Sequence, residues 1–222
     1  MTASTSARAI AREQLTRTIL TSARAQLGTV GPAQLSVRAV ARDIGMVSSA
    51  VYRYFSSRDE LISELLVICY DELGAEVEAA EAAVADRSDI RGRWLAIAHA
   101  VRRWALAHPF DYALLYGSPV PGYAAPQRTV GPATRVPRLV IALLPGIADP
   151  DGGPVNPELH QALAGIRDFA GMELTDELVM RGLQSWSGLI GAISLELFGH
   201  LANGVLDHET YFAQLARRLA PV

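Results

Sequence analysis

The sequence predicts an all-α protein in which a small three-helix domain is followed by a larger helical domain. Apolar residues recur at helical spacing in most segments, and no stretch sustains the apolar–polar alternation that marks a half-buried strand. Two short helical patterns joined at Gly45 are followed at once by a long one, and we find no internal repeat.

The first helix is predicted over residues 6–27, because one apolar stripe runs along it: Ala11, Leu15, Ile19, Ala23 and Leu27. Gly28, Gly31 and Pro32 are expected to end this helix. Ser36 is the predicted N-cap of the second helix, since its hydroxyl oxygen can accept a backbone N–H that would otherwise lack a partner.

The segment over residues 35–61 predicts a helix, a tight turn and a second short helix. Gly45 is expected to stop the first of these helices at a point where the backbone needs a positive φ. The inward faces of the two helices are formed by apolar residues: Val37, Val40, Ala41, Ile44, Met46, Val51 and Phe55.

The outward face of the second short helix carries the groups that suit a DNA surface. Hydroxyl and phenol groups bond phosphate oxygens, and a guanidinium can read the edge of guanine. We expect base readout from Ser49 and Arg53, and phosphate contacts from Tyr52, Tyr54 and Arg58. Arg58 is a cation at a helix N-terminus, which is unfavourable by itself, and a phosphate bound there would offset it. The full set of candidate DNA-binding residues is Arg38, Ser48, Ser49, Tyr52, Arg53, Tyr54 and Arg58. Taken alone, the two tyrosines fit half-buried aromatic residues equally well.

The remaining helices follow from caps, spacing and proline positions. Ser57 and Glu60 form a capping box that opens a long helix over residues 58–85. Most of the 12 prolines lie between Pro109 and Pro157, which predicts short helices and loops there. Further helices are predicted over residues 90–108, 110–116, 135–144, 157–169, 175–201 and 207–219.

Charge and cysteine content narrow the class of protein. The first 60 residues hold eight arginines and four carboxylates, which gives them a net charge of +4. Because the whole chain has a net charge of −3, the remaining residues carry −7. Such an asymmetry is typical of a nucleic-acid-binding module joined to another domain. The single cysteine, Cys69, cannot form an intrachain disulfide, which favours a location in the cytoplasm. No apolar run is long enough to cross a bilayer, so no membrane partner is expected.

Large rings with polar tips in the second domain are candidates for a ligand cavity. These predicted ligand-binding residues are Trp94, Val101, Trp104, His108, Tyr112, Tyr116 and Trp186. The alternative interpretation, ordinary core packing, fits any one of them better, and periodicity does not decide which residues would line a cavity.

The helix over residues 175–201 is apolar around most of its circumference and must be buried on more than one side. A core face combined with a dimer face explains this better than a central core helix alone. The predicted dimer-interface residues are Leu183, Ile190, Ile193 and Leu197.

Enzyme signatures are absent from the sequence. The five histidines lack metal-ligand spacing, and no nucleophile elbow, phosphate-binding loop or dinucleotide glycine pattern occurs. We therefore expect no catalytic residues, no metal and no cofactor.

Residues 12–66, with the SVRAVARDIG and VYRYFSSRDEL segments, resemble the amino-terminal domain of the TetR family of bacterial transcription regulators, and look like its actinobacterial branch. The resemblance implies a helix-turn-helix DNA-binding domain over residues 1–57 and a helical effector-binding and dimerisation domain over residues 58–222. Members usually carry Ser or Thr as the N-cap where Val47 stands, so Ser48 is expected to provide the cap one residue later.

These expectations describe a homodimeric, cytoplasmic repressor that a small molecule of unknown identity releases from a palindromic double-stranded DNA operator. Two other functions remain open on the sequence: an effector-independent DNA-binding regulator or activator, and an enzyme or small-molecule carrier with a vestigial helix-turn-helix.

Overall fold

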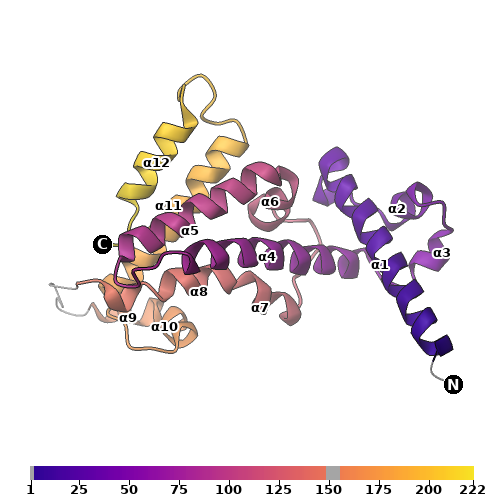
Figure 1. Ribbon diagram of the computed structural model, residues 1–222, viewed down its shortest axis with the longest axis horizontal. Coiled ribbons are helices and arrows are strands. Elements are labelled where there is room, and N and C mark those ends of the chain that lie inside the picture. Colours follow the sequence, from indigo (N-terminus) through magenta and orange to yellow (C-terminus); the bar gives the residue numbers. More distant parts are fainter. Residues whose placement is uncertain (1–2, 149–155) are drawn as a thin grey trace. The chain divides into compact units, whose positions relative to one another are not determined.

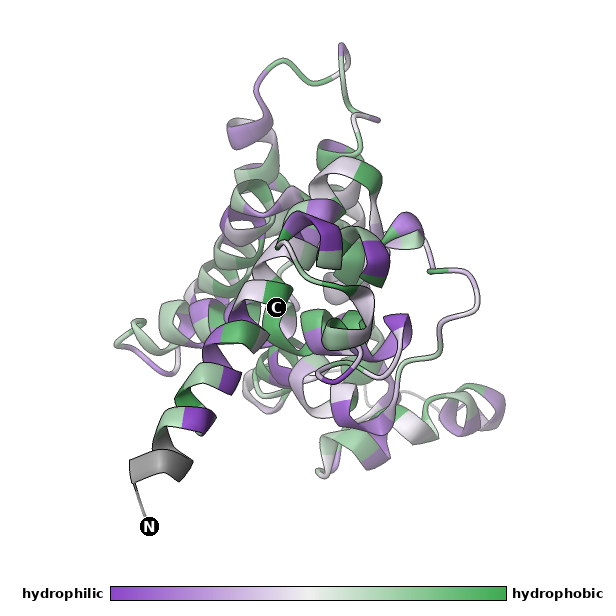
Figure 2. Ribbon diagram, turned by 90° about the vertical axis from the view of Figure 1, so that its right-hand side faces the viewer, coloured by the Kyte–Doolittle hydropathy of each residue, from purple (hydrophilic) through white to green (hydrophobic). Residues whose placement is uncertain are grey.

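A computed structural model describes residues 3–148 and 156–222, and every secondary-structure element in these ranges is helical (Figure 1). The predicted all-α class is therefore confirmed. The chain forms two compact units: residues 1–69 with 110–130, the N-terminal unit, and residues 70–109 with 131–222, the C-terminal unit. Figure 2 shows polar and apolar bands alternating along most helices, as expected where each helix buries one side.

The described helices of the N-terminal unit are α1 (Ala3–Val30), η1 (Pro32–Gln34), α2 (Val37–Asp43), α3 (Ser48–Val51), the start of α4 (Arg58–Ala82), α6 (Pro109–Tyr116) and η2 (Gln127–Thr129). α1 is longer than predicted, because Gly28 lies inside it and does not end it. A Cβ at Gly28 would come 3.1 Å from the ring of Phe110, so this glycine admits an aromatic side chain against the helix. Gly31, with φ of 73°, follows the end of the helix.

The helix-turn-helix is built largely as predicted. The Ser36 hydroxyl accepts the backbone N–H of Ala39 at 3.5 Å, and Gly45 follows α2 with φ of 69°. The expected cap at Ser48 is wrong: Ser48 is the first residue of α3, and Val47 is its N-cap without a side-chain hydrogen bond. α3 therefore begins without a side-chain cap.

Residues 110–130 are attached to the N-terminal unit by polar contacts. Arg24 Nε donates to Asp111 at 2.9 Å, and Asp111 is almost fully buried. The hydroxyls of Ser63 and Tyr123 lie 2.9 Å apart, and Arg128 pairs with Glu64. These contacts group the start of α4 and residues 110–130 with the helix-turn-helix, whereas the sequence places its domain boundary at residue 57.

The C-terminal unit contains the rest of α4, α5 (Ile90–Ala107), α7 (Val130–Ala133), α8 (Arg135–Ile141), η3 (Leu144–Gly146), α9 (Pro157–Ala162), α10 (Ala164–Ala170), α11 (Asp176–Leu197) and α12 (His208–Arg218). The helix predicted over residues 157–169 is two helices, because the chain turns at Leu163, whose side chain is buried in the core of this unit. α11 ends before the predicted residue 201, since Gly199 follows it with φ of 77°.

α5 lies at the centre of the C-terminal unit and contacts α8, α11 and α12. The Trp94 indole N–H donates to the backbone carbonyl of Ala216 in α12 at 2.8 Å. Arg102, which is 7% exposed, bonds Glu196 of α11 through two nitrogens and also pairs with Glu209 of α12. The hydrogen bonds that Arg102 donates to Glu196 raise the pKa of Arg102, which joins three helices as a permanent cation.

α8 is joined to the second half of α4 by a similar arginine. Arg135 donates to both carboxylate oxygens of Glu78, at 2.8 and 2.6 Å, and to Asp71 at 2.9 Å. The Arg135 hydrogen bonds lower the pKa of Glu78. A Cβ at Gly74 would lie 2.6 Å from Arg135 Nε, so the guanidinium crosses α4 over this glycine.

In the ranges that the structure describes, no helix has both the length and the apolar content needed to cross a lipid bilayer.

Gly74→Ala should destabilise the protein although alanine favours helix. The added methyl group must displace Arg135 from Glu78 and Asp71, and such overpacking costs about 1–3 kcal/mol, more than the roughly 0.5–1 kcal/mol gained in helix propensity. Gly165→Ala in α10, where the methyl group meets no atom within 4 Å, is the matched control. Urea unfolding should show a lower midpoint for Gly74→Ala alone. A higher midpoint in both variants would contradict the Arg135 contact.

The His99 side chain predicts a pH dependence of stability. Burial lowers the pKa of His99, whose ring stands edge-on to Phe212 at 5.5 Å between centroids. Glu209 opposes this shift, whereas Arg102, Arg103 and Arg217 reinforce it.

Below the unfolded-state pKa of about 6.5 the unfolded chain binds a proton that folded His99 does not. The free energy of unfolding should therefore fall as the pH drops from about 7 to about 5. His99→Gln should flatten the profile in this range, as measured by urea unfolding at each pH. An unchanged slope in the variant would assign the dependence to other groups.

Candidate nucleic-acid interface

The surface of α3 and the turn that follows it carries the predicted DNA-binding side chains. α3 is α-helical only from Ser48 to Val51, and Tyr52, Arg53 and Tyr54 continue in turns in which Arg53 and Tyr54 donate their N–H groups to Ala50 and Val51. The α-helical part is therefore shorter than the stretch over residues 48–54 that holds most of the candidate DNA-binding residues. Its inward side is fixed by Val51 and Phe55, both buried.

The predicted residues differ in how far they are available to a ligand. Ser49, Tyr52 and Arg53 are exposed, with 45% of Tyr52 accessible, and Arg38 on α2 is exposed as well. Ser48 and Tyr54 are half-buried. The polar face therefore consists mainly of one serine, one phenol and two guanidinium groups.

Tyr54 is held by a residue that the sequence analysis missed. The guanidinium carbon of Arg12, in α1, lies 5.2 Å from the centre of the Tyr54 ring, at cation–π distance. No spacing rule connects two residues so far apart in the chain, so the pair could not be found from the sequence. The contact places the Arg12 guanidinium against the ring of Tyr54.

Arg58 is engaged within its own unit. Its Nε donates to the carbonyl of Leu35 at 2.9 Å, and Nη2 donates to the carbonyls of Pro32 and Ala33 at 3.0 and 2.8 Å. Three carbonyl oxygens thus accept from this cation at the N-terminus of α4, and they account for its position without a bound phosphate. Arg58 joins the start of α4 to the segment that leads into α2.

The start of α4 is capped by serines and Glu60. The Ser57 hydroxyl accepts the N–H of Glu60 at 3.0 Å, as a capping box requires. The Glu60 carboxylate accepts from the hydroxyl and N–H of Ser56 rather than from Ser57, and these bonds lower the pKa of Glu60. The helix that follows α3 is therefore capped and anchored at its first turn.

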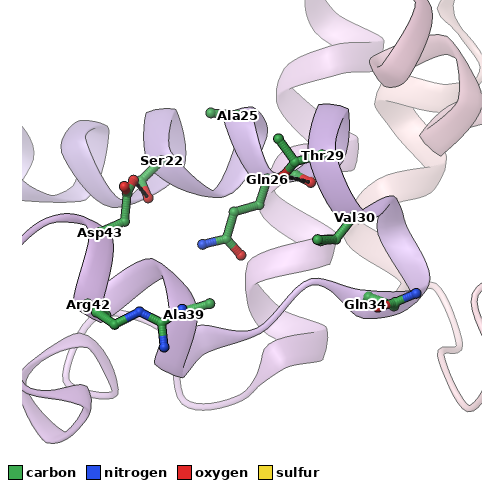
Figure 3. Close-up of a pocket in the computed structure, with 9 residues that line it drawn as sticks. All are labelled: Ser22, Ala25, Gln26, Thr29, Val30, Gln34, Ala39, Arg42 and Asp43. Atoms are coloured by element: carbon green, nitrogen blue, oxygen red, sulfur yellow. Dashed lines mark hydrogen bonds between the residues drawn. The ribbon is translucent and has the colours of Figure 1, made fainter.

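A hollow of about 350 Å³ lies between α1, η1 and α2 (Figure 3). In the figure, the Gln26 amide projects from α1 into this space above Arg42, and Ser22 meets Asp43 at one end. The Ser22 hydroxyl donates to Asp43 at 2.5 Å, and the buried Gln26 Oε1 accepts no hydrogen bond from the described residues. The walls of this hollow are mixed, since Ala25, Val30 and Ala39 line it together with polar and charged side chains.

Comparison with known proteins agrees with this architecture. Residues 19–65 match the model of the "Bacterial regulatory proteins, tetR family", and residues 94–219 match the "Tetracyclin repressor-like, C-terminal domain". The chain belongs to the TetR family. It is therefore a helix-turn-helix transcription regulator that binds DNA, and not an enzyme.

Relatives of the TetR family match almost the whole chain. HTH-type transcriptional regulator Rv1816 of Mycobacterium tuberculosis is 45% identical, with 96% of this chain and 93% of the relative covered, and regulator Mb1846 of Mycobacterium bovis gives the same values. The solved structure of regulatory protein SCO4313 superposes with a TM-score of 0.79 at 33% identity, covering 94% of this chain and 96% of that one. A protein of unknown function from Rhodococcus sp. RHA1 shares the fold, with a TM-score of 0.64 at 24% identity and coverage of 93% and 95%.

The seven predicted ligand-binding residues are distributed over both units of this TetR-family protein. Trp94, Val101 and Trp104 are buried in α5, and Trp104 contacts the ring of His108 at 5.2 Å. Tyr112 and Tyr116, whose rings also lie 5.2 Å apart, belong to the N-terminal unit. Trp186 lines a cavity between α8, α10 and α11 in the C-terminal unit. A common site for all seven stays a prediction.

Glycines separate the faces of α11 in a way that the sequence does not reveal. A Cβ at Gly182 would meet Leu144 at 3.1 Å and one at Gly188 would meet Leu219 at 2.5 Å, whereas one at Gly191 meets nothing within 4 Å. The side that holds Gly191 also exposes Met180, Ser187, Leu195 and Phe198, and we call these five residues the outer face of α11.

The predicted dimer-interface residues lie partly beside this outer face. Leu183, Ile190 and Leu197 are half-buried and adjoin it on the helix. Ile193 is fully buried in its own unit and offers no surface to a partner subunit, which corrects the sequence interpretation of this residue. It lies on the core side of α11, as Leu189 does.

Arg53→Ala and Arg58→Ala should separate DNA contact from folding. Arg53 is exposed, so its truncation should leave the melting temperature unchanged and cost about 1–3 kcal/mol of sequence discrimination if it reads a base. Arg58→Ala removes three charge-assisted hydrogen bonds and should lower the stability of the N-terminal unit by about 1–3 kcal/mol.

The measurements are thermal unfolding and fluorescence anisotropy with duplexes selected from a random library, each over a range of salt concentrations. Loss of DNA affinity in Arg58→Ala at unchanged stability would support the phosphate contact predicted from the sequence.

Proposed function

We propose that the protein is a homodimeric repressor that a small molecule releases from a near-palindromic operator. The observation that carries the proposal is the exposed set of Ser49, Tyr52 and Arg53 beside a capped and anchored α4. Arginine and tyrosine groups of this kind bond phosphates and base edges, and they bind DNA with a strong dependence on salt. The proposed location is the cytoplasm, where a regulator of transcription meets its operator.

Dimer formation is supported by the outer face of α11. Met180, Leu195 and Phe198 are 41%, 43% and 44% exposed, and Gly191 and Ser187 between them would let another helix approach closely. Burying such apolar surface against a second copy is favourable in proportion to its area. Two copies would place their α3 segments about 34–36 Å apart, in successive major grooves.

Release by a small molecule is supported by the position of α4 in the chain. α4 begins in the N-terminal unit and ends in the C-terminal unit, where Arg135 joins it to α8. A ligand that favours one position of α4 changes the affinity for DNA by its differential affinity for the two states. Coupling of this kind is typically about 1–3 kcal/mol, or about 5–150-fold in DNA affinity.

Gly191→Arg tests the dimer and the operator together. The arginine has open space in the single subunit but would block close approach of a second copy, so we expect a folded monomer with weakened operator binding. Gly165→Arg places the same side chain in open space on α10 and should remain a dimer with normal binding.

Sedimentation velocity and anisotropy with a two-half-site duplex measure both effects. If Gly191→Arg remained a dimer, the outer face of α11 would not be the interface. If the parent protein bound one half-site as tightly as two, dimeric binding would be overturned.

A further inference from the structure

The C-terminal unit contains a cavity of its own, whose walls are almost wholly apolar. The cavity has a volume of about 300 Å³ and is formed by α8, α10 and α11. Its walls include Val140, Ile141, Ile166, Phe169, Leu183 and Trp186. This volume is at the lower end of the range for small-molecule sites, and two aromatic rings among aliphatic side chains are typical of them.

The charge of the walls limits the class of ligand. Among the described residues that line the cavity, none has an ionisable side chain. A charged ligand would lose its hydration there without a counter-charge, which is unfavourable. Arg138 is an exposed residue outside the cavity lining, and its guanidinium carbon lies 4.5 Å from the centre of the Phe169 ring.

We infer that this cavity binds one uncharged, mainly hydrocarbon molecule of about two to three fused or linked rings in size, and that α8 carries its effect to α4. α8 lines the cavity through Val140 and Ile141, and its first residue, Arg135, bonds Glu78 and Asp71 across Gly74. A molecule that moves α8 must therefore move Arg135 relative to α4 or pull α4 with it. The coupling through α8 to α4 rests on the proposed function, whereas the ligand class of the cavity does not.

A matched pair of dyes tests the ligand class directly. N-phenylnaphthylamine is uncharged and fluoresces in apolar surroundings, and anilinonaphthalenesulfonate has the same rings with one added sulfonate. We expect the neutral dye to bind at one site per subunit, and the anionic dye to bind at least about tenfold more weakly. Tighter binding of the anion, lost in Arg138→Ala, would overturn the assignment of an uncharged ligand.

Ile166→Trp locates the site, because its larger side chain fills the cavity. It should reduce binding of the neutral dye at least about tenfold, whereas Gly165→Leu, on the same helix in open space, should not. Thermal unfolding shows that each variant is folded. If Ile166→Trp does not fold, Ile141→Phe serves in its place, and unchanged dye binding in a folded filled variant would overturn the site.

Operator binding in the presence of the neutral dye tests the coupling. We expect a loss of DNA affinity that disappears in Ile166→Trp and shrinks in Arg135→Gln, although Arg135→Gln still binds the dye. Dye binding without any change in operator affinity would overturn the coupling and leave the ligand class standing. Absence of operator binding by the parent protein, with or without dye, would instead overturn the proposed function.

Discussion

The position of α3 and the turn after it depends on the guanidinium of Arg58. α3 has a single turn and no side-chain cap, so it has little stability of its own. Its direction is set by the buried Val51 and Phe55 and by the first turn of α4, which Arg58 joins to the carbonyls of Pro32, Ala33 and Leu35. A planar fork with several donors can serve three carbonyls at once, and a lysine could not reproduce this geometry.

The same chemistry recurs at the helix contacts of the C-terminal unit. Arg102 joins α5 to α11 and α12, and Arg135 joins α8 to α4, each through more than one donor. All 20 basic residues of the chain are arginines, which makes such contacts available throughout. Removing one partner of the nearly buried Arg102 group would leave a charge unpaired, so these contacts specify the arrangement of helices as well as stabilising it.

The sequence predicted those features that depend on neighbouring residues. Helical spacing located the helices, and Ser36, Gly45 and Ser57 marked their ends because caps and positive φ angles are local properties. Features set by distant partners escaped it. Gly28 was predicted to end a helix, whereas Phe110 packs against it inside the helix, and the hydrogen bond from the Trp94 N–H to Ala216 joins residues far apart in the chain. The roles of Arg12 and Arg58 belong to the same group.

α11 shows why apolar content alone could not assign surfaces. One broad side holds Gly182 and Trp186, which face the cavity, and Leu189 and Ile193, which are buried in the core; the opposite side, with Gly191, is open. Leu183 lines the cavity and also adjoins the outer face. In the proposed dimer a ligand therefore sits one side chain from the partner subunit. Linkage then requires that dimerisation alter ligand affinity by the same factor as the ligand alters dimerisation, so any coupling between these two events at α11 acts in both directions.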